Sequence, residues 1–194
     1  MELFPLFGFI DLKTLLLIGH VGGVALGAGV AFFSALIFTK VMYDGVVTKN
    51  EMTLLEAASS VVSVGLTLIV LTGIGMFMLN QEGYLASSKF LVKMTVVAVL
   101  ILNGVLIHTL HIKALKKHIG TYLPNVPGFV MRSYAMYAGG AISMTSWATA
   151  LILGVFRGVP YSYQQILLVY LAVLVGAIAL ALCLHFFTFA KKKR

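Results

Sequence analysis

The sequence predicts an all-α integral membrane protein, formed by a single bundle of five transmembrane helices over residues 1–194. The first observation is composition: 60% of the 194 residues are hydrophobic and only 10% are charged, whereas soluble domains carry about 25% charged residues. The mean hydropathy of +1.03 agrees with this. The second observation is a series of five apolar runs, each long enough to cross about 30 Å of hydrocarbon. The short connections leave no room for a soluble domain.

The apolar runs follow one another along the chain at residues 13–39, 53–79, 89–112, 129–156 and 164–189. The first run is longer than the apolar core of a signal peptide and follows Glu2 and Asp11 instead of a basic stretch. It also lacks a small-residue cleavage site, so we expect it to be retained as a helix.

The connections carry turn and capping signals. Residues 40–52 are expected to form one loop, with an Asp-Gly turn signal at Gly45. Residues 80–88 are expected to form the next loop, in which Ser87 or Ser88 is suited to cap the following helix.

The basic residues predict the orientation in the membrane. With an odd number of spans the termini lie on opposite sides, and the side richer in Lys and Arg is cytoplasmic. One side would hold Lys40, Lys49, Lys113, Lys116, Lys117, Arg132, Lys191, Lys192, Lys193 and Arg194, against Lys13, Lys89, Lys93 and Arg157 on the other. We therefore expect a multi-pass protein of the cell (inner) membrane, with its N-terminus outside and its C-terminus cytoplasmic. The same residues account for most of the net charge of +8, so no nucleic-acid partner is expected.

Titratable side chains inside the apolar runs are the candidates for function, because polar groups in hydrocarbon are costly. His20 and Lys93 fall near the outer ends of the first and third helices. His108, His111 and His185 fall near the inner ends of the third and fifth helices. A rise of 1.5 Å per residue places Lys93 and His108 about 22 Å apart along the helix axis. The sequence therefore predicts two separate levels.

His20 stands beside a row of small residues, Gly19, Gly23 and Gly27, that recurs every four positions. Such a row is typical of close helix packing, and it would also admit a flat macrocycle. Imidazole is a common axial ligand of haem iron, so His20 is a candidate haem ligand, with a hydrogen-bonded core histidine as the alternative. Lys93 is a candidate counter-ion for a haem propionate or an anionic substrate, or a neutral amine. The alternative is a lysine that only reaches the headgroups.

A histidine in the first helix followed by a lysine in FLVKMTVVAVLILNGVLIH resembles the HemJ-type protoporphyrinogen oxidases and the related CopD-like membrane proteins. The resemblance covers roughly the first four helices. It implies a small helical bundle that binds haem b, with His20 and Lys93 as the functional pair. The stretch HVGGVALGAGVAFF lacks the tryptophan expected after the histidine, and the chain has a fifth helix. These departures make a branch of the superfamily without an assigned activity the closer match.

At the inner level, His108 and His185 form the preferred pair for a second haem, with His111 as an additional candidate. Copper or zinc bound by the three histidines is the alternative. A third interpretation is that these histidines lie at helix ends and bind no ligand. Trp147 could bond a propionate or stack beside a ring, and Met76 could be a sixth iron ligand. Both residues also suit ordinary packing.

The leading interpretation is a haem b membrane protein, holding one or two haems, that performs electron transfer or haem-dependent oxidoreduction. A metal or small-molecule transporter is the alternative, and a membrane anchor for a peripheral partner is the third interpretation. The redox partner, a quinone-like or porphyrin-like substrate, catalytic residues and homo-oligomerisation stay open.

Overall fold

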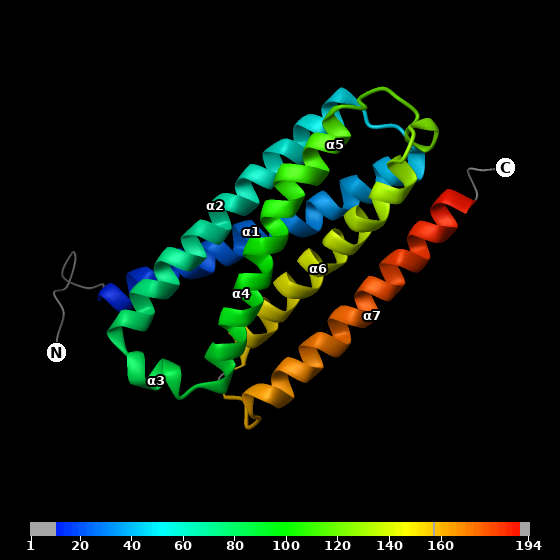
Figure 1. Ribbon diagram of the computed structural model, residues 1–194. Helices are drawn as coiled ribbons and strands as arrows, with labels where there is room; N and C mark the ends of the chain where they lie inside the picture. Colours follow the sequence, from blue (N-terminus) through cyan, green and yellow to red (C-terminus); the bar gives the residue numbers. More distant parts are fainter. Residues whose placement is uncertain (1–10, 157, 191–194) are drawn as a thin grey trace.

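A computed structural model describes residues 11–156 and 158–190 of the chain, and within these ranges it is built of helices (Figure 1). Five helical segments are long and apolar enough to cross a membrane, which confirms the predicted number of spans. They are α1 (Leu12–Asp44), α2 (Lys49–Leu79), α4 continuing into α5 (Ser88–Lys116), α6 (Phe129–Val155) and α7 (Tyr163–Ala190). The length and composition of these helices are compatible with a multi-pass membrane protein.

The first helix begins where Asp11 caps it. The Asp11 carboxylate accepts a hydrogen bond from the Thr14 backbone N–H at 2.8 Å, which satisfies one of the unpaired donors of the first turn. Hydrogen bonds from the side chain and the backbone of Thr14 lower the pKa of the Asp11 carboxyl below its usual range.

The loop expected at 40–52 is shorter in the structure, because α1 and α2 extend into it and leave only residues 45–48 between them. Gly45 ends α1 in the left-handed conformation at φ 78°, which glycine adopts without steric cost. Thr48 and Glu51 form a capping box at the start of α2. Lys40 also bonds Asp44 at 2.9 Å and Glu51 at 2.6 Å. These polar contacts hold the last turn of α1 and the first turn of α2 in helical form.

The connection at 80–88 contains a short helix, α3 (Gln81–Leu85). Ser87 caps α4 (Ser88–Leu106) by accepting a hydrogen bond from the Phe90 backbone N–H at 3.4 Å, one of the two caps predicted. The third span then changes its winding: a π-helical segment, η1 (Ile107–His111), separates α4 from α5 (Ile112–Lys116). Such π segments are rare and often occur at functional sites.

The bundle has two ends, which we name after the short helices that mark them. The α3 end holds the start of α1, the start of α4, the end of α6 and the start of α7 (Figure 1). The α5 end holds the turn between α1 and α2 and the connection that leads into α6, which includes the short helix η2 (Leu123–Asn125).

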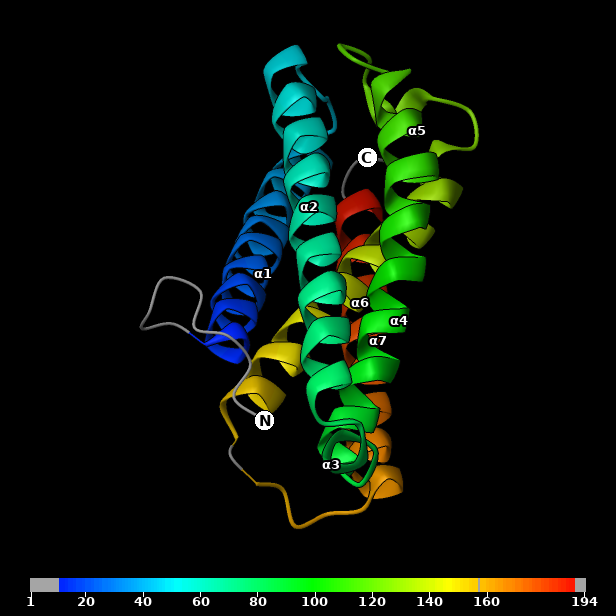
Figure 2. The ribbon, with the colours of Figure 1, turned by 90° about the vertical axis from the view of Figure 1, so that its left-hand side faces the viewer.

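Helices α1 and α2 form a tightly packed hairpin (Figure 2). A Cβ placed on Gly65 of α2 would lie 2.7 Å from the backbone nitrogen of Gly27 and 2.8 Å from the carbonyl oxygen of Gly23. The backbones can approach this closely only because glycine has no side chain. Trp147 of α6 covers Gly27 on the same row, and a Cβ there would overlap the indole ring. The glycine row of α1 is therefore a helix-packing surface.

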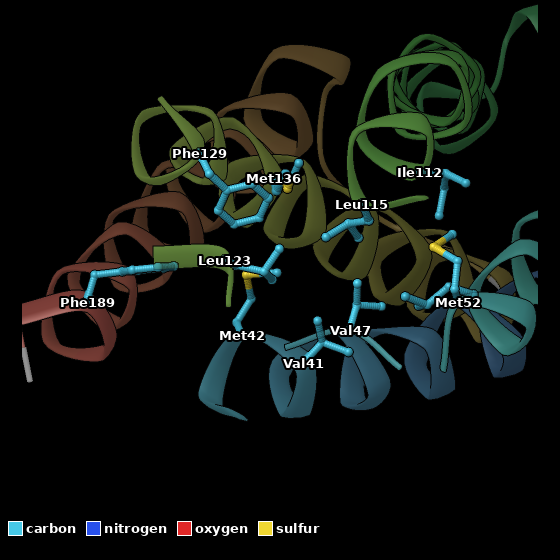
Figure 3. Packing of buried hydrophobic residues seen from close by; sticks show 11 residues of the cluster. Val41, Met42, Val47, Met52, Ile112, Leu115, Leu123, Phe129, Met136 and Phe189 are labelled. Carbon is cyan, nitrogen blue, oxygen red and sulfur yellow. The ribbon is translucent and has the colours of Figure 1, made fainter. Parts of the chain in front are cut away.

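The second part of the bundle consists of α4, α6 and α7, with α6 in contact with α4, α7 and α1. A buried apolar cluster joins the two parts at the α5 end (Figure 3). Val41, Met42 and Val47 from the hairpin meet Leu115 and Leu123 there.

Backbone bonds reinforce the α5 end. The Leu123 N–H donates to the Gly45 carbonyl at 2.7 Å, and the Gly120 N–H donates to the Val47 carbonyl at 2.9 Å. The turn of the hairpin and the connection before α6 are therefore tied to each other.

Candidate functional site

His20 lies on α1 near the α3 end and is half-buried against α2. Its Nδ1 is 3.1 Å from the Thr72 hydroxyl oxygen. That hydroxyl has one proton, and it donates this proton to the Leu68 carbonyl at 2.6 Å. Thr72 can therefore only accept from His20, which assigns the ring proton to Nδ1 and the lone pair to Nε2. A histidine held through Nδ1–H, with Nε2 unprotonated, is the usual state of a metal-ligating imidazole.

Glycine borders the His20 ring, and a lysine lies toward the same end of the bundle. A Cβ on Gly73 of α2 would lie 3.7 Å from the ring carbon Cε1, so α2 presents a bare backbone to one side of the imidazole. Lys93 lies on α4 near the start of this helix, at the same end of the bundle. The structure therefore brings His20 and Lys93, predicted to share a level, to the same end of the bundle.

Lys93 is half-buried and points toward the end of α6, where a Cβ on Gly154 would lie 4.0 Å from its Nζ. Within residues 11–156 and 158–190 it forms no ion pair. Lys89, one turn earlier, donates from Nζ to the Phe156 carbonyl at 2.6 Å. Two amines on one face of α4 thus make this end of the site cationic, with an anion as the natural ligand.

Trp147 and Met76 are placed differently. Trp147 is only 1% exposed and lies over Gly27, about 10 Å along α1 from His20. Met76 is half-buried on α2, on the turn that follows Gly73. Within the described residues, neither side chain forms a hydrogen bond with His20, and the iron-related roles predicted for them stay predictions.

At the α5 end, His108 and His111 lie on the π-helical segment η1. The Nδ1 of His108 is 2.9 Å from the Ser59 hydroxyl of α2. His111 lies against α6, where a Cβ on Gly139 would be 3.0 Å from its Cε1. Asn103 holds the same glycine by donating from Nδ2 to its carbonyl at 2.9 Å. The π segment thus directs one histidine toward α2 and the other toward α6.

Both histidines line a cavity of about 1030 Å³ between the α1–α2 hairpin and α4, α6 and α7. Its wall is mostly apolar and includes Trp147. The polar side chains in the wall are hydroxyls and imidazoles, contributed by Ser34, Thr39, Tyr43, Ser59, Ser63, Thr67, His108, Thr109, His111, Tyr137, Ser143, Thr145 and Thr188. The lining, taken over the described residues, includes no Lys, Arg, Asp or Glu.

His185 is packed into the interface of α6 and α7 and is 1% exposed. Its Nε2 lies 2.7 Å from the Ser133 hydroxyl, and its ring is 3.8 Å from that of Tyr134 and 4.7 Å from that of Phe189. The Nδ1 atom is buried without a hydrogen-bond partner in the described part of the chain. His185 is absent from the cavity wall, so the structure does not bring it to a common site with His108.

No group of three or more His, Cys, Asp or Glu suited to a metal ion occurs within the described ranges. The sequence interpretation overlooked Thr72 and Ser59, whose hydroxyls orient His20 and His108. Hydroxyl residues on an apolar helix are a weak signal, because most of them only bond the preceding turn of their own helix.

No protein-family model matches this chain, and no curated protein or solved structure does so either. What these sites can do therefore follows from the chemistry of their own side chains.

Proposed function

We propose that this chain is a haem b-binding integral membrane protein that performs electron transfer or haem-dependent oxidoreduction, with His20 as an axial ligand of the iron. The observation that carries the proposal is the pair of contacts made by the Thr72 hydroxyl, one with His20 and one with the Leu68 carbonyl, from which we infer the tautomer of His20. Thr72 donates its only hydroxyl proton to the Leu68 carbonyl, so it can only accept a hydrogen bond from His20 Nδ1–H. The His20 Nε2 is then unprotonated, and its lone pair is available to a ligand. The imidazole is thus already in the protonation state that binding to iron requires.

The charge around His20 also fits haem b, which carries two propionate groups. Lys93 and Lys89 lie one turn apart on α4 at the α3 end, the end that also holds His20, so this end offers cations for these carboxylates. The cavity at the α5 end offers no charged side chain among the described residues that line it. The α3 end is therefore the better haem site of the two, although the cavity is large.

The resemblance to the HemJ-type oxidases and CopD-like proteins supports the same assignment, because it places its functional pair at His20 and Lys93. Bound haem would supply a one-electron redox centre. The chain's own residues would hold the group: His20 would bind the iron, Thr72 would orient that ring, and Lys93 would neutralise a propionate.

An absorption spectrum of the purified protein tests the proposal. After expression with ample haem, the wild-type protein should show a b-type Soret band, and His20→Ala should lose that band or its main component. His108→Ala is the matched control, because it removes an imidazole about 22 Å away along the axis. Circular dichroism should show unchanged helix content in both variants.

A colourless wild-type protein would contradict the proposal and would favour a transporter or a membrane anchor. Loss of all haem in His108→Ala, with His20→Ala unaffected, would place the cofactor at the other end of the bundle.

A further inference from the structure

The cavity at the α5 end has no role in the haem proposal, and its lining residues differ from those around His20. We propose that it binds a membrane quinone: a neutral ring with oxygen acceptors, carried on a long apolar tail. The inference does not rest on the proposed haem function, and either one can fail without the other.

The polar groups on the cavity wall indicate the chemistry of the ligand's head group. His108 and Ser59 form a bonded pair that faces the cavity, and His111 lines it from the neighbouring turn of η1. Imidazole nitrogens and hydroxyls can donate hydrogen bonds to quinone carbonyls and accept them from the hydroxyls of a quinol. The π-helical winding, which brings both histidines to this cavity, is a second observation typical of a functional site.

The absence of charge narrows the ligand further. A phospholipid or a haem would bring phosphate or carboxylate groups into the membrane interior, where an unpaired charge is costly. The described residues of the lining offer no cation to either group. A quinone carries no charge, and its polar atoms can be matched by the uncharged hydroxyls and imidazoles of the wall. Pockets of roughly 300–1,000 Å³ are typical of small-molecule sites, and this cavity of about 1030 Å³ is at the upper end.

The cavity is also open toward the membrane. Leu71 of α2, Val105 of α4 and Leu180 of α7 line it and are 62%, 55% and 62% exposed, and the cavity is not enclosed by the bundle. In a bilayer these surfaces face lipid tails, so a lipid-soluble ligand can enter from the side without crossing water. Along α2, Ser63 and Thr67 continue from Ser59 at successive turns, and most of the other residues in the wall are apolar, as a tail requires.

Trp147 provides the experiment, because it is the only tryptophan in the chain and it lines the cavity. Quinones quench tryptophan fluorescence at short range. Decylubiquinone added to the full-length protein in nanodiscs should quench the emission in a saturable way. Partition into the lipid alone would instead give quenching that rises without saturation.

Four variants separate the outcomes. Gly140→Leu fills the cavity, because Gly140 lines it and has open space beside its Cα, and the dissociation constant should rise at least tenfold. Gly176→Leu is the matched control: Gly176 also has open space but lies outside the cavity wall, and binding should be unchanged. Ser59→Ala and His108→Phe each remove a partner for the head and should weaken binding about fivefold, the worth of one ordinary hydrogen bond.

Two results would overturn the proposal. The first is non-saturable quenching of equal strength in the wild type and in all four variants. The second is equal displacement of decylubiquinone by dodecylbenzene or by a lysophospholipid, because neither carries the quinone head on which the assignment depends.

Discussion

The most direct test of the His20 argument is Thr72→Val, a substitution that keeps the shape of the side chain and removes its hydroxyl. The methyl group that packs on Gly19 is retained, so the packing between α1 and α2 is preserved. What is lost is the acceptor 3.1 Å from the His20 Nδ1. The ring is then no longer held in the tautomer that leaves Nε2 as a ligand.

The expected magnitude follows from two independent considerations. A donor left without its partner costs about 1–3 kcal/mol when buried, and the half-burial of His20 favours the lower end of that range. Removing a group that orients a metal ligand lowers metal affinity by about 10- to 100-fold, which corresponds to about 1.4–2.7 kcal/mol. We therefore expect Thr72→Val to weaken haem binding about tenfold.

The assay is a haem titration followed by the Soret band, together with ¹⁵N NMR of the imidazole rings. Thr72→Ser keeps the hydroxyl and should bind as the wild type does. Thr53→Val is the control for loss of a helix-bonded hydroxyl, because Thr53 donates to the Lys49 carbonyl at 3.0 Å and lies at the opposite end of α2 from Thr72. Wild-type affinity in Thr72→Val, or a His20 ring protonated at Nε2 in the haem-free wild type, would refute the tautomer argument.

Three further outcomes are expected. Gly65→Ala should lower the free energy of unfolding in detergent by about 1–3 kcal/mol through overpacking, because its Cβ would lie 2.7 Å from the backbone of α1. Gly22 has open space around it, so Gly22→Ala should be neutral or stabilising by up to about 1 kcal/mol. If Gly65→Ala and Gly22→Ala changed the stability equally, the close approach of α1 and α2 would be contradicted. If Lys93 pairs with a propionate, Lys93→Arg should keep the haem midpoint potential and Lys93→Met should shift it. If both variants have the midpoint potential of the wild type, the lysine only reaches the headgroups. A reporter that works only in the cytoplasm should be active when it is fused to the C-terminus. Activity of a reporter that works only outside the cell would contradict the predicted orientation.

The sequence alone determined the class of the protein and the helical segments, because both depend on local properties. The number of spans follows from the lengths of apolar runs relative to the thickness of a bilayer. Gly45 and Ser87 were recognisable as a turn and a cap because each acts on residues within a few positions. The end of α1 was placed too early and the start of α2 too late, because the ion pair between Lys40 and Glu51 that holds these turns joins two helices.

The candidate sites were only partly predictable. Their histidines were identifiable, because a titratable side chain in an apolar run is costly wherever the helix faces. Whether that cost is offset by a neighbour depends on residues far away in the sequence. His20 meets Thr72 at a separation of 52 positions, and His185 meets Ser133 at the same separation. The contact with Thr72 leaves the Nε2 of His20 available to a ligand, whereas the contact with Ser133 holds His185 inside a packed interface.

The cavity has the same origin. Its wall combines residues from five spans, and no periodicity within one helix indicates how far apart two helices will stand. Close approach of α1 and α2 depends on glycines that face each other, Gly23 and Gly27 against Gly65. The sequence of each helix determines where its small and polar residues lie, but only the packing of the helices decides which of them meet, because contact is a property of pairs.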